Sequence, residues 1–321
     1  MSFIKKHGFK IIKWLVLTVS LLFLVQRIVF HQDVKTIFSN LTSTDYHQWA
    51  LFLVVFVLLF FNWGIEAIKW RFAVKNIHII SFKRAFAAVL AGTSVSLFMP
   101  NRTGEFVGRI FALPFEKRIQ GIFASVVASF SQLLVTIICG SFAIITYFKL
   151  YPENALTQKN ISFWIVIPVI LTTLLSIILY FKISWFTFLF KKWHFLKKYA
   201  EKAKVLSEYP FIILLQFLML SFFRYMVFLV QFHLLIVFFG IDISFINSIL
   251  ASALTFYIVT LIPTFTLAEI GVRGSVAVLF FGFFSNAYSE IVAASTLLWL
   301  INVGIPGAIG NYFILRFKEN S

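Results

Sequence analysis

Apolar segments long enough to cross a membrane recur along the chain and constrain its fold more than any other feature. They cover residues 1–30, 48–68, 119–149, 161–181, 209–239 and 289–315. A transmembrane helix needs about 20 apolar residues, and the alternating pattern of a membrane barrel is absent. Because 60% of the 321 residues are hydrophobic, a soluble core of this length could not bury them. We therefore predict an all-α integral membrane protein, a polytopic helical bundle that forms a single transmembrane domain.

The basic residues predict the orientation of this bundle. The net charge is +16, and the Lys and Arg side chains cluster in short loops beside the apolar segments. Such clusters mark the cytoplasmic side, so Lys69, Arg71 and Lys75 are assigned to a cytoplasmic loop after the second segment. Both termini are then cytoplasmic, a bacterial inner membrane is the expected location, and no nucleic acid partner is needed to explain the charge. The single Cys139 excludes a disulfide framework, and no cofactor or metal site is predicted.

A basic and aromatic linker, about residues 182–208, joins the two halves of the chain. It contains seven lysines, from Lys182 to Lys204, interleaved with Trp and Phe side chains. One interpretation is a helix lying on the inner leaflet and attracting anionic head groups, because each basic residue near the surface contributes roughly 1 kcal/mol. The other is a connecting loop that only obeys the orientation rule. Both interpretations stay open, and neither identifies a substrate.

Two polar breaks interrupt the apolar pattern. The first is residues 100–109 within the apolar region 82–114, and the second is residues 263–273 within 245–284. Each begins with a proline and contains a Glu-x-x-x-Arg pair. A charged side chain in hydrocarbon costs at least about 2.5 kcal/mol, so ionisable residues at this depth indicate function. Irregular backbone inside a membrane must be surrounded by protein or line a cavity, so we predict two broken or re-entrant helical hairpins around an internal site.

The two breaks also indicate an internal duplication. A Ser-Phe pair precedes the proline by 19 residues in both breaks, at Ser81 and at Ser244. The predicted topology puts the first hairpin on the cytoplasmic side and the second on the outer side. We therefore predict two inverted repeats, about 48–149 and about 209–316. In transporters built this way, the substrate site lies near the membrane midplane, where broken helices point their polar ends at it.

The charged residues of the breaks are the candidate substrate ligands. These are Arg102, Glu105, Arg109, Glu269 and Arg273, together with Arg224 in the span before the second hairpin. The Glu and the Arg of each pair are four residues apart and share one helix face. Arginine suits phosphate oxygens, and helix starts capped by Thr103 or Thr266 would add free N–H groups. The simpler interpretation is that each Glu only neutralises its own Arg.

Two of these arginines have no obvious partner on their own segment. Arg102 is the better candidate for a free anion ligand for that reason. Arg224 has three possible roles, pairing with Glu66, pairing with a hairpin glutamate, or lining the cavity, and these alternatives stay open. Gln132 and His233 are predicted to be hydrogen-bonding groups between helices rather than ligands.

The two motifs carry a family resemblance. Pro100-Asn101-Arg102-Thr103-Gly104-Glu105 followed by Arg109, and later Gly271-Val272-Arg273, resemble the flippase-like transmembrane domain family. This is the membrane region of lysylphosphatidylglycerol synthase, which also occurs as stand-alone bacterial proteins. The resemblance covers roughly residues 10–316. In the family pattern the second motif ends in Glu, whereas Gly274 stands at that position here, and Glu269 one turn earlier could supply the carboxylate.

The resemblance implies that the chain moves a lipid between leaflets. The expected cargo is an anionic or aminoacylated phospholipid or a polyprenyl-linked lipid, so the partners are membrane lipids and, as a further possibility, a separate lipid-modifying enzyme. Enzyme activity is not expected, because aminoacyl transfer in the two-part enzymes resides in a separate soluble domain and this chain stops at Ser321. The alternatives are a membrane-embedded transferase acting on lipid-linked substrates and a transporter of small soluble anions.

Overall fold

The computed structural model describes residues 46–99, 102–151, 159–264 and 266–319. Within these ranges the secondary structure is helical, without strands. Five helical stretches there are long and apolar enough to cross a membrane: Trp49–Ala73, Phe115–Leu150, Trp164–Phe181, Phe211–Phe238 and Tyr288–Phe317. They match five predicted spans, so the helical membrane bundle is confirmed. The predicted first span, residues 1–30, and the predicted outer loop around residue 152 lie outside the described residues.

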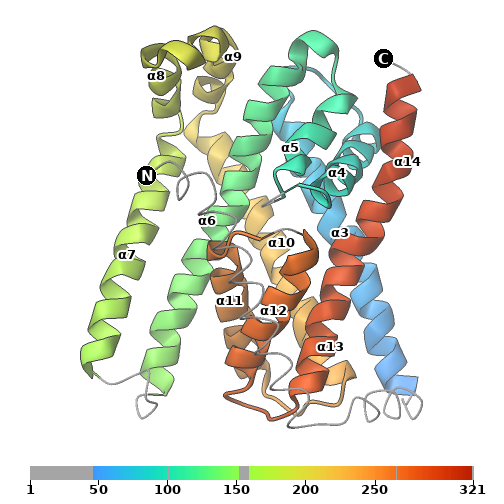
Figure 1. Ribbon diagram of the computed structural model, residues 1–321, viewed down its shortest axis with the longest axis vertical. Coiled ribbons are helices and arrows are strands. Elements are labelled where there is room, and N and C mark those ends of the chain that lie inside the picture. Colours follow the sequence, from blue (N-terminus) through green and yellow to red (C-terminus); the bar gives the residue numbers. More distant parts are fainter. Residues whose placement is uncertain (1–45, 100–101, 152–158, 265, 320–321) are drawn as a thin grey trace, which may run out of the picture. The chain divides into compact units, whose positions relative to one another are not determined.

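The helices are labelled in Figure 1. Their bounds are α3 (Tyr46–Ala73), α4 (Phe82–Ser96), α5 (Gly104–Arg109), α6 (Arg118–Leu150), α7 (Lys159–Phe181), α10 (Phe211–Phe238), α11 (Phe245–Leu261), α12 (Thr266–Phe281), α13 (Tyr288–Trp299) and α14 (Ile305–Glu319). A single π-helical turn, Leu300–Gly304, joins α13 to α14. Pro306 follows this turn, and a proline ring disrupts the regular bonding of the preceding turn.

The contacts divide the chain into two compact units. Unit 1 contains Phe228–Ile305 together with the described parts of residues 1–60 and 97–102. Unit 2 contains Phe61–Ser96, Thr103–Val227 and the end of the chain from Pro306. Helices α3 and α10 therefore contribute residues to both units. Neither unit coincides with a predicted repeat, and the inverted repeat stays a prediction.

The two arms of the first break, α4 and the short α5, lie side by side in unit 2 (Figure 1). Glycines bring the two backbones into contact. A Cβ atom at Gly108 would lie 2.5 Å from the carbonyl oxygen of Ala91, and one at Gly104 would lie 2.5 Å from that of Val95. The two glycines are four residues apart and share one face of α5, as small residues often do between membrane helices. The broken hairpin is thus confirmed, and it depends on these glycines.

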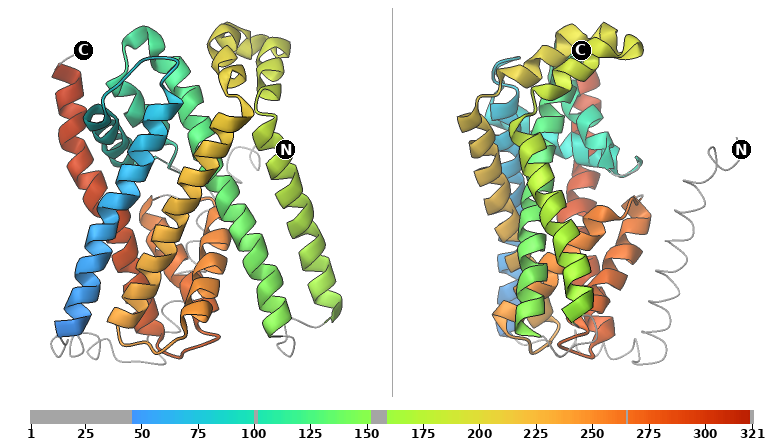
Figure 2. Two further views of the ribbon diagram at one scale, coloured as in Figure 1. Left: turned by 180° about the vertical axis from the view of Figure 1, so that it is seen from behind. Right: turned by 90° about the vertical axis from the view of Figure 1, so that its left-hand side faces the viewer.

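Two further helix contacts hold unit 2 together. Helices α6 and α7, drawn in green, run side by side, and the hydroxyls of Ser141 and Thr173 lie 2.7 Å apart between them (Figure 2). Helix α14 packs on α4, where the Ser94 hydroxyl donates to the Asn311 side chain at 2.5 Å. A side chain at Gly310 would collide with the Leu90 carbonyl oxygen. This glycine therefore permits the close approach of α14.

The linker at residues 182–208 is not one helix. It consists of α8 (Trp185–Lys192), α9 (Ala200–Ala203) and two 3₁₀ segments, His194–Tyr199 and Lys204–Glu208. The extended backbone of Trp193 ends α8, so the linker is not the one helix of the first interpretation, and its place at the inner leaflet stays a prediction. Val205 and Leu206 are buried, while Trp185 and Phe195 are exposed beside the lysines.

In unit 1 the second break folds as α11 and α12, the orange helices that lie side by side in Figure 2. Helix α11 begins where predicted, because the Ser244 hydroxyl caps it by accepting the Asn247 backbone N–H at 3.3 Å. A buried amide network supports the unit. The Gln231 side chain donates to the Val55 carbonyl oxygen at 2.9 Å and accepts from Asn302 at 3.1 Å. It connects α3, α10 and the π-helical turn.

Candidate functional site

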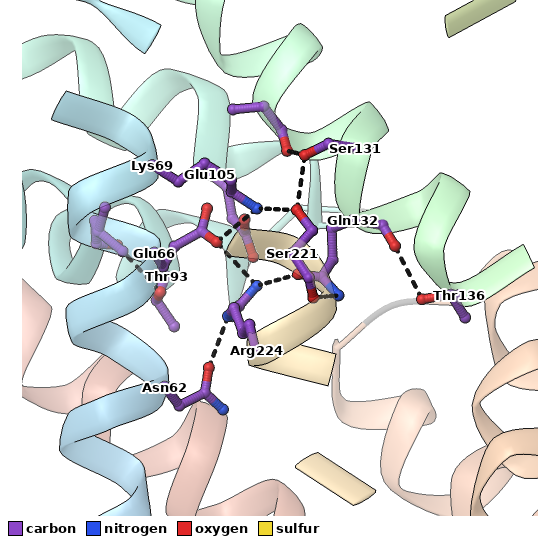
Figure 3. Close-up of polar contacts among 12 residues, drawn as sticks. Asn62, Glu66, Lys69, Thr93, Glu105, Ser131, Gln132, Thr136, Ser221 and Arg224 are labelled. Carbon is purple, nitrogen blue, oxygen red and sulfur yellow. Dashed lines mark hydrogen bonds and ion pairs between the residues drawn. The ribbon is translucent and has the colours of Figure 1, made fainter. Parts of the chain in front are cut away.

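A buried carboxylate in α3 binds three cationic side chains in unit 2, and Figure 3 labels two of them, Lys69 and Arg224. One oxygen of Glu66 lies 2.9 Å from Arg109, and the other lies 3.0 Å from Lys69 and 3.1 Å from Arg224. Arg109 also pairs with Glu105 at 2.9 Å, as the Glu-x-x-x-Arg spacing predicts. These five residues are called the Glu66 cluster. It joins α3, α5 and α10 through charged contacts that are largely shielded from solvent.

The position of Lys69 differs from the one predicted from the sequence. Helix α3 continues to Ala73, so this lysine does not lie in a cytoplasmic loop but is fully buried. Its amine is held by Glu66 and donates to the Ser221 hydroxyl at 3.0 Å. The spacing of Asn62, Glu66 and Lys69 places all three on one face of a helix. This stripe of polar residues on one face of α3 is the sequence pattern from which the burial of Lys69 could have been predicted.

Arg224 pairs with Glu66, which decides between the alternatives left by the sequence. Its Nε atom donates to the Asn62 side chain at 2.6 Å, and its guanidinium lies 5.3 Å from the Trp63 ring centroid. Gln132 accepts a long hydrogen bond from Arg224 at 3.5 Å and donates to the Ser221 carbonyl oxygen at 3.4 Å. The predicted interhelical role of Gln132 is confirmed.

The charges of the Glu66 cluster do not balance. Three cations, Lys69, Arg109 and Arg224, face two carboxylates, Glu66 and Glu105, in the ion pairs of the described residues. A surplus positive charge that is shielded from water is costly unless a counter-charge accompanies it. The buried Nε atom of Arg109 also has no hydrogen-bond partner. The cluster can therefore accept an anionic group.

A second cluster lies in unit 1 and consists of Arg102, Glu269 and Arg273. Glu269 pairs with Arg273 at 2.5 Å, as its spacing predicts, and with Arg102 at 3.5 Å. This Glu269 cluster also has one more cation than carboxylates. The Arg273 guanidinium lies 5.8 Å from the Phe256 ring centroid, and its Nε atom is buried without a hydrogen-bond partner. The arrangement repeats the charge surplus of the Glu66 cluster.

The prediction that Arg102 is a free ligand is wrong, because the two breaks meet at its ion pair with Glu269. Its backbone φ is 56°, a left-handed conformation that few residues other than glycine adopt. Strained residues of this kind are concentrated at functional sites. The side chain is still 32% exposed, although its Nε and Nη2 atoms are buried.

Three other predicted polar roles need correction. Thr103 makes no capping hydrogen bond from its side chain, and α5 is only six residues long. Thr266 is the first residue of α12 rather than the residue before it. Neither threonine therefore acts as the predicted cap of a helix start. His233 makes no hydrogen bond through Nδ1 and instead packs edge-on against Phe245, with ring centroids 4.9 Å apart.

Comparison with protein families gives a match that covers most of the chain. Residues 11–310 match the family described as the lysylphosphatidylglycerol synthase TM region. The chain belongs to this family. Comparisons with curated proteins and with solved structures gave no match. The expected second motif has Glu where this chain has Gly274, and in the structure Arg273 pairs with Glu269, four residues earlier in the chain. In the described ranges, no group of three or more His, Cys, Asp or Glu side chains is arranged to hold a metal ion.

Proposed function

We propose that this protein moves lipids between the leaflets of a bacterial cytoplasmic membrane, and that its two charge clusters bind the head-group phosphate. The proposed cargo is an anionic or aminoacylated phospholipid or a polyprenyl-linked lipid. The observation that carries the proposal is the surplus cation in both clusters, held among apolar helices. Membership of a family named for a lipid synthase supports a lipid as the cargo.

The chemistry of the clusters suits a phosphate head group. A phosphodiester carries one negative charge, which would balance the surplus cation of either cluster. Arginine binds phosphate oxygens through a planar fork of N–H groups. The side chains of Arg224 and Arg273 are each 12% exposed, so neither is fully shielded from a bound lipid. The carboxylates in the same clusters would receive the ammonium group of an aminoacylated head group.

The proposed role is translocation without chemical modification of the lipid. A separate lipid-modifying enzyme would then supply the modified cargo. A small soluble anion would be attracted by the same surplus cation, so small-anion transport is the second candidate. The apolar surface of the spans favours a lipid, because acyl tails can remain in contact with it while the head group crosses.

Arg224→Gln is the variant that tests this proposal. It brings the Glu66 cluster to neutrality, so we expect the variant to fold. It also removes a charged donor, so translocation of head-group-labelled phosphatidylglycerol in liposomes is expected to fall about 10-fold or more. The measurement is the rate at which labelled lipid becomes accessible to a membrane-impermeant quencher.

The matched control is Lys204→Gln, which removes one cation from the exposed pair with Glu201 and should leave the rate unchanged. Wild-type liposomes that flip lipid no faster than protein-free liposomes, under either an ion gradient or a membrane potential, would refute the proposal. Uptake of glycerol phosphate in place of lipid movement would favour the small-anion transporter.

A further inference from the structure

Unit 2 contains a second basic site, none of whose residues belongs to the Glu66 cluster. A cavity of about 1360 Å³ opens between the start of α4 with the residues just before it, the segment that follows α5, and the end of α14. Its basic lining residues are Lys83, Arg84, Arg118 and Arg316, against the single carboxylate of Glu116. This cavity is called the basic pocket.

Backbone carbonyl groups position two arginines of the basic pocket. Arg84 donates from Nε to the Ala112 carbonyl oxygen at 2.9 Å, and Arg118 donates from Nε to the adjacent Leu113 carbonyl oxygen at 3.4 Å. Each arginine has five N–H groups, so both retain their terminal Nη groups for another ligand. Two forks fixed by neighbouring carbonyls can bind two oxygens of one phosphate.

The positive charge of these side chains is not neutralised by the protein. Lys83, Arg84 and Arg118 form no ion pair with a carboxylate in the described part of the chain. Carbonyl groups accept hydrogen bonds but carry no net charge. The repulsion among these cations therefore favours a bound anion.

Phenylalanines make the basic pocket suitable for an amphiphile rather than a simple ion. Six of them line it: Phe82, Phe86, Phe111, Phe115, Phe313 and Phe317. Arg118 lies 5.5 Å from the ring centroids of both Phe111 and Phe115, and Phe115 is 76% exposed. Contact with this apolar surface does not stabilise a bound soluble anion, whereas it does stabilise glycerol and acyl groups. The clustered lysines and arginines assign the basic pocket to the cytoplasmic side.

We propose that the basic pocket binds the head group of an anionic glycerophospholipid from the inner leaflet, with its phosphate between Arg84 and Arg118. Its acyl chains lie along the exposed phenylalanines. Binding at this site does not require translocation. It can therefore be measured on detergent-solubilised protein, independently of any lipid movement.

The test is a titration of the solubilised full chain with phosphatidylglycerol that carries a fluorescent acyl chain. Replacing both Arg84 and Arg118 with Gln is expected to weaken binding about 30-fold, since each basic residue near anionic lipid contributes about 1 kcal/mol. Lys83→Gln alone is expected to weaken binding about 5-fold. Because Lys83 is exposed and its side chain makes no hydrogen bond in the described structure, this variant keeps the test valid if the double variant does not fold.

The matched control replaces Lys197 and Lys198 in the linker with Gln, which removes the same charge from exposed positions. Its affinity should stay within about 2-fold of wild type, because screened surface charge contributes little. An equal loss in this control would overturn the proposal by showing general surface attraction. Equal binding of phosphatidylcholine would also overturn the proposal, because the site would then not select lipids with a net negative charge. Displacement of the labelled lipid by free glycerol phosphate would overturn it too, because the site would then bind soluble anions.

Discussion

Replacing Glu66 with glutamine is expected to destabilise the protein by about 3–5 kcal/mol, because the buried Lys69 and Arg109 and the half-buried Arg224 lose their shared carboxylate. Glutamine has nearly the same shape, so the loss is electrostatic rather than a packing defect. Lys69, Arg109 and Arg224 would then face Glu105 alone. The measurement is reversible unfolding in mixed micelles of increasing denaturing detergent.

Two further variants make this result specific. Combining Glu66→Gln with Lys69→Met restores the original surplus of one cation, and we expect the double variant to recover about half of the lost stability. Glu201→Gln breaks an exposed pair with Lys204 and should change nothing measurable. If Glu66→Gln unfolds at the wild-type detergent concentration, the carboxylate does not hold the three helices together.

Replacing Gly108 with alanine is the second substitution that we expect to lower the stability of the protein strongly. The new methyl group would lie 2.5 Å from backbone atoms of Ala91 and Gly92, which cannot move aside as a flexible side chain can. Overpacking of this kind costs about 1–3 kcal/mol, and the backbone contact puts this site at the upper end. Since α5 carries both Glu105 and Arg109, the displacement should also lower lipid translocation.

Gly64→Ala in α3 is the matched control. A Cβ atom at this position would meet nothing within 4 Å, and alanine is favoured over glycine in a helix by up to about 1 kcal/mol. We therefore expect the control to be neutral or slightly stabilising in the same unfolding experiment. Equal stability of the two variants would mean that α4 and α5 do not depend on close backbone contact.

The features that could be predicted from the sequence are those with a local cause. Apolar length predicts the spans, proline predicts the breaks, and four-residue spacing predicts the Glu105 and Arg109 pair and the Glu269 and Arg273 pair. Each depends on residues within a few positions of one another. These local patterns also carried the family resemblance that the family comparison confirmed.

The features that could not be predicted depend on contacts between distant segments. No spacing rule relates Arg102 to Glu269, because they lie on different breaks and meet only in the folded unit. Lys69 was assigned to a loop because a lysine after an apolar run usually faces the cytoplasm. It is buried because Glu66 balances its charge and Glu66 and Ser221 together accept from two of its three donors. The ion pair partner of Arg224 likewise became clear only from the helix packing.

The central claim is that the surplus cation in each cluster binds the phosphate of a lipid head group. Its most direct test compares two labelled lipids with the same acyl chains in liposomes that contain the wild-type protein. One is phosphatidylglycerol, and the other is glucosyl diacylglycerol, which has a polar head group without phosphate. We expect the protein to accelerate translocation of phosphatidylglycerol. The uncharged glycolipid should cross at the same rate as in liposomes without protein. Equal acceleration of both lipids would contradict the account, because a head group without charge cannot balance the surplus cations of the two clusters.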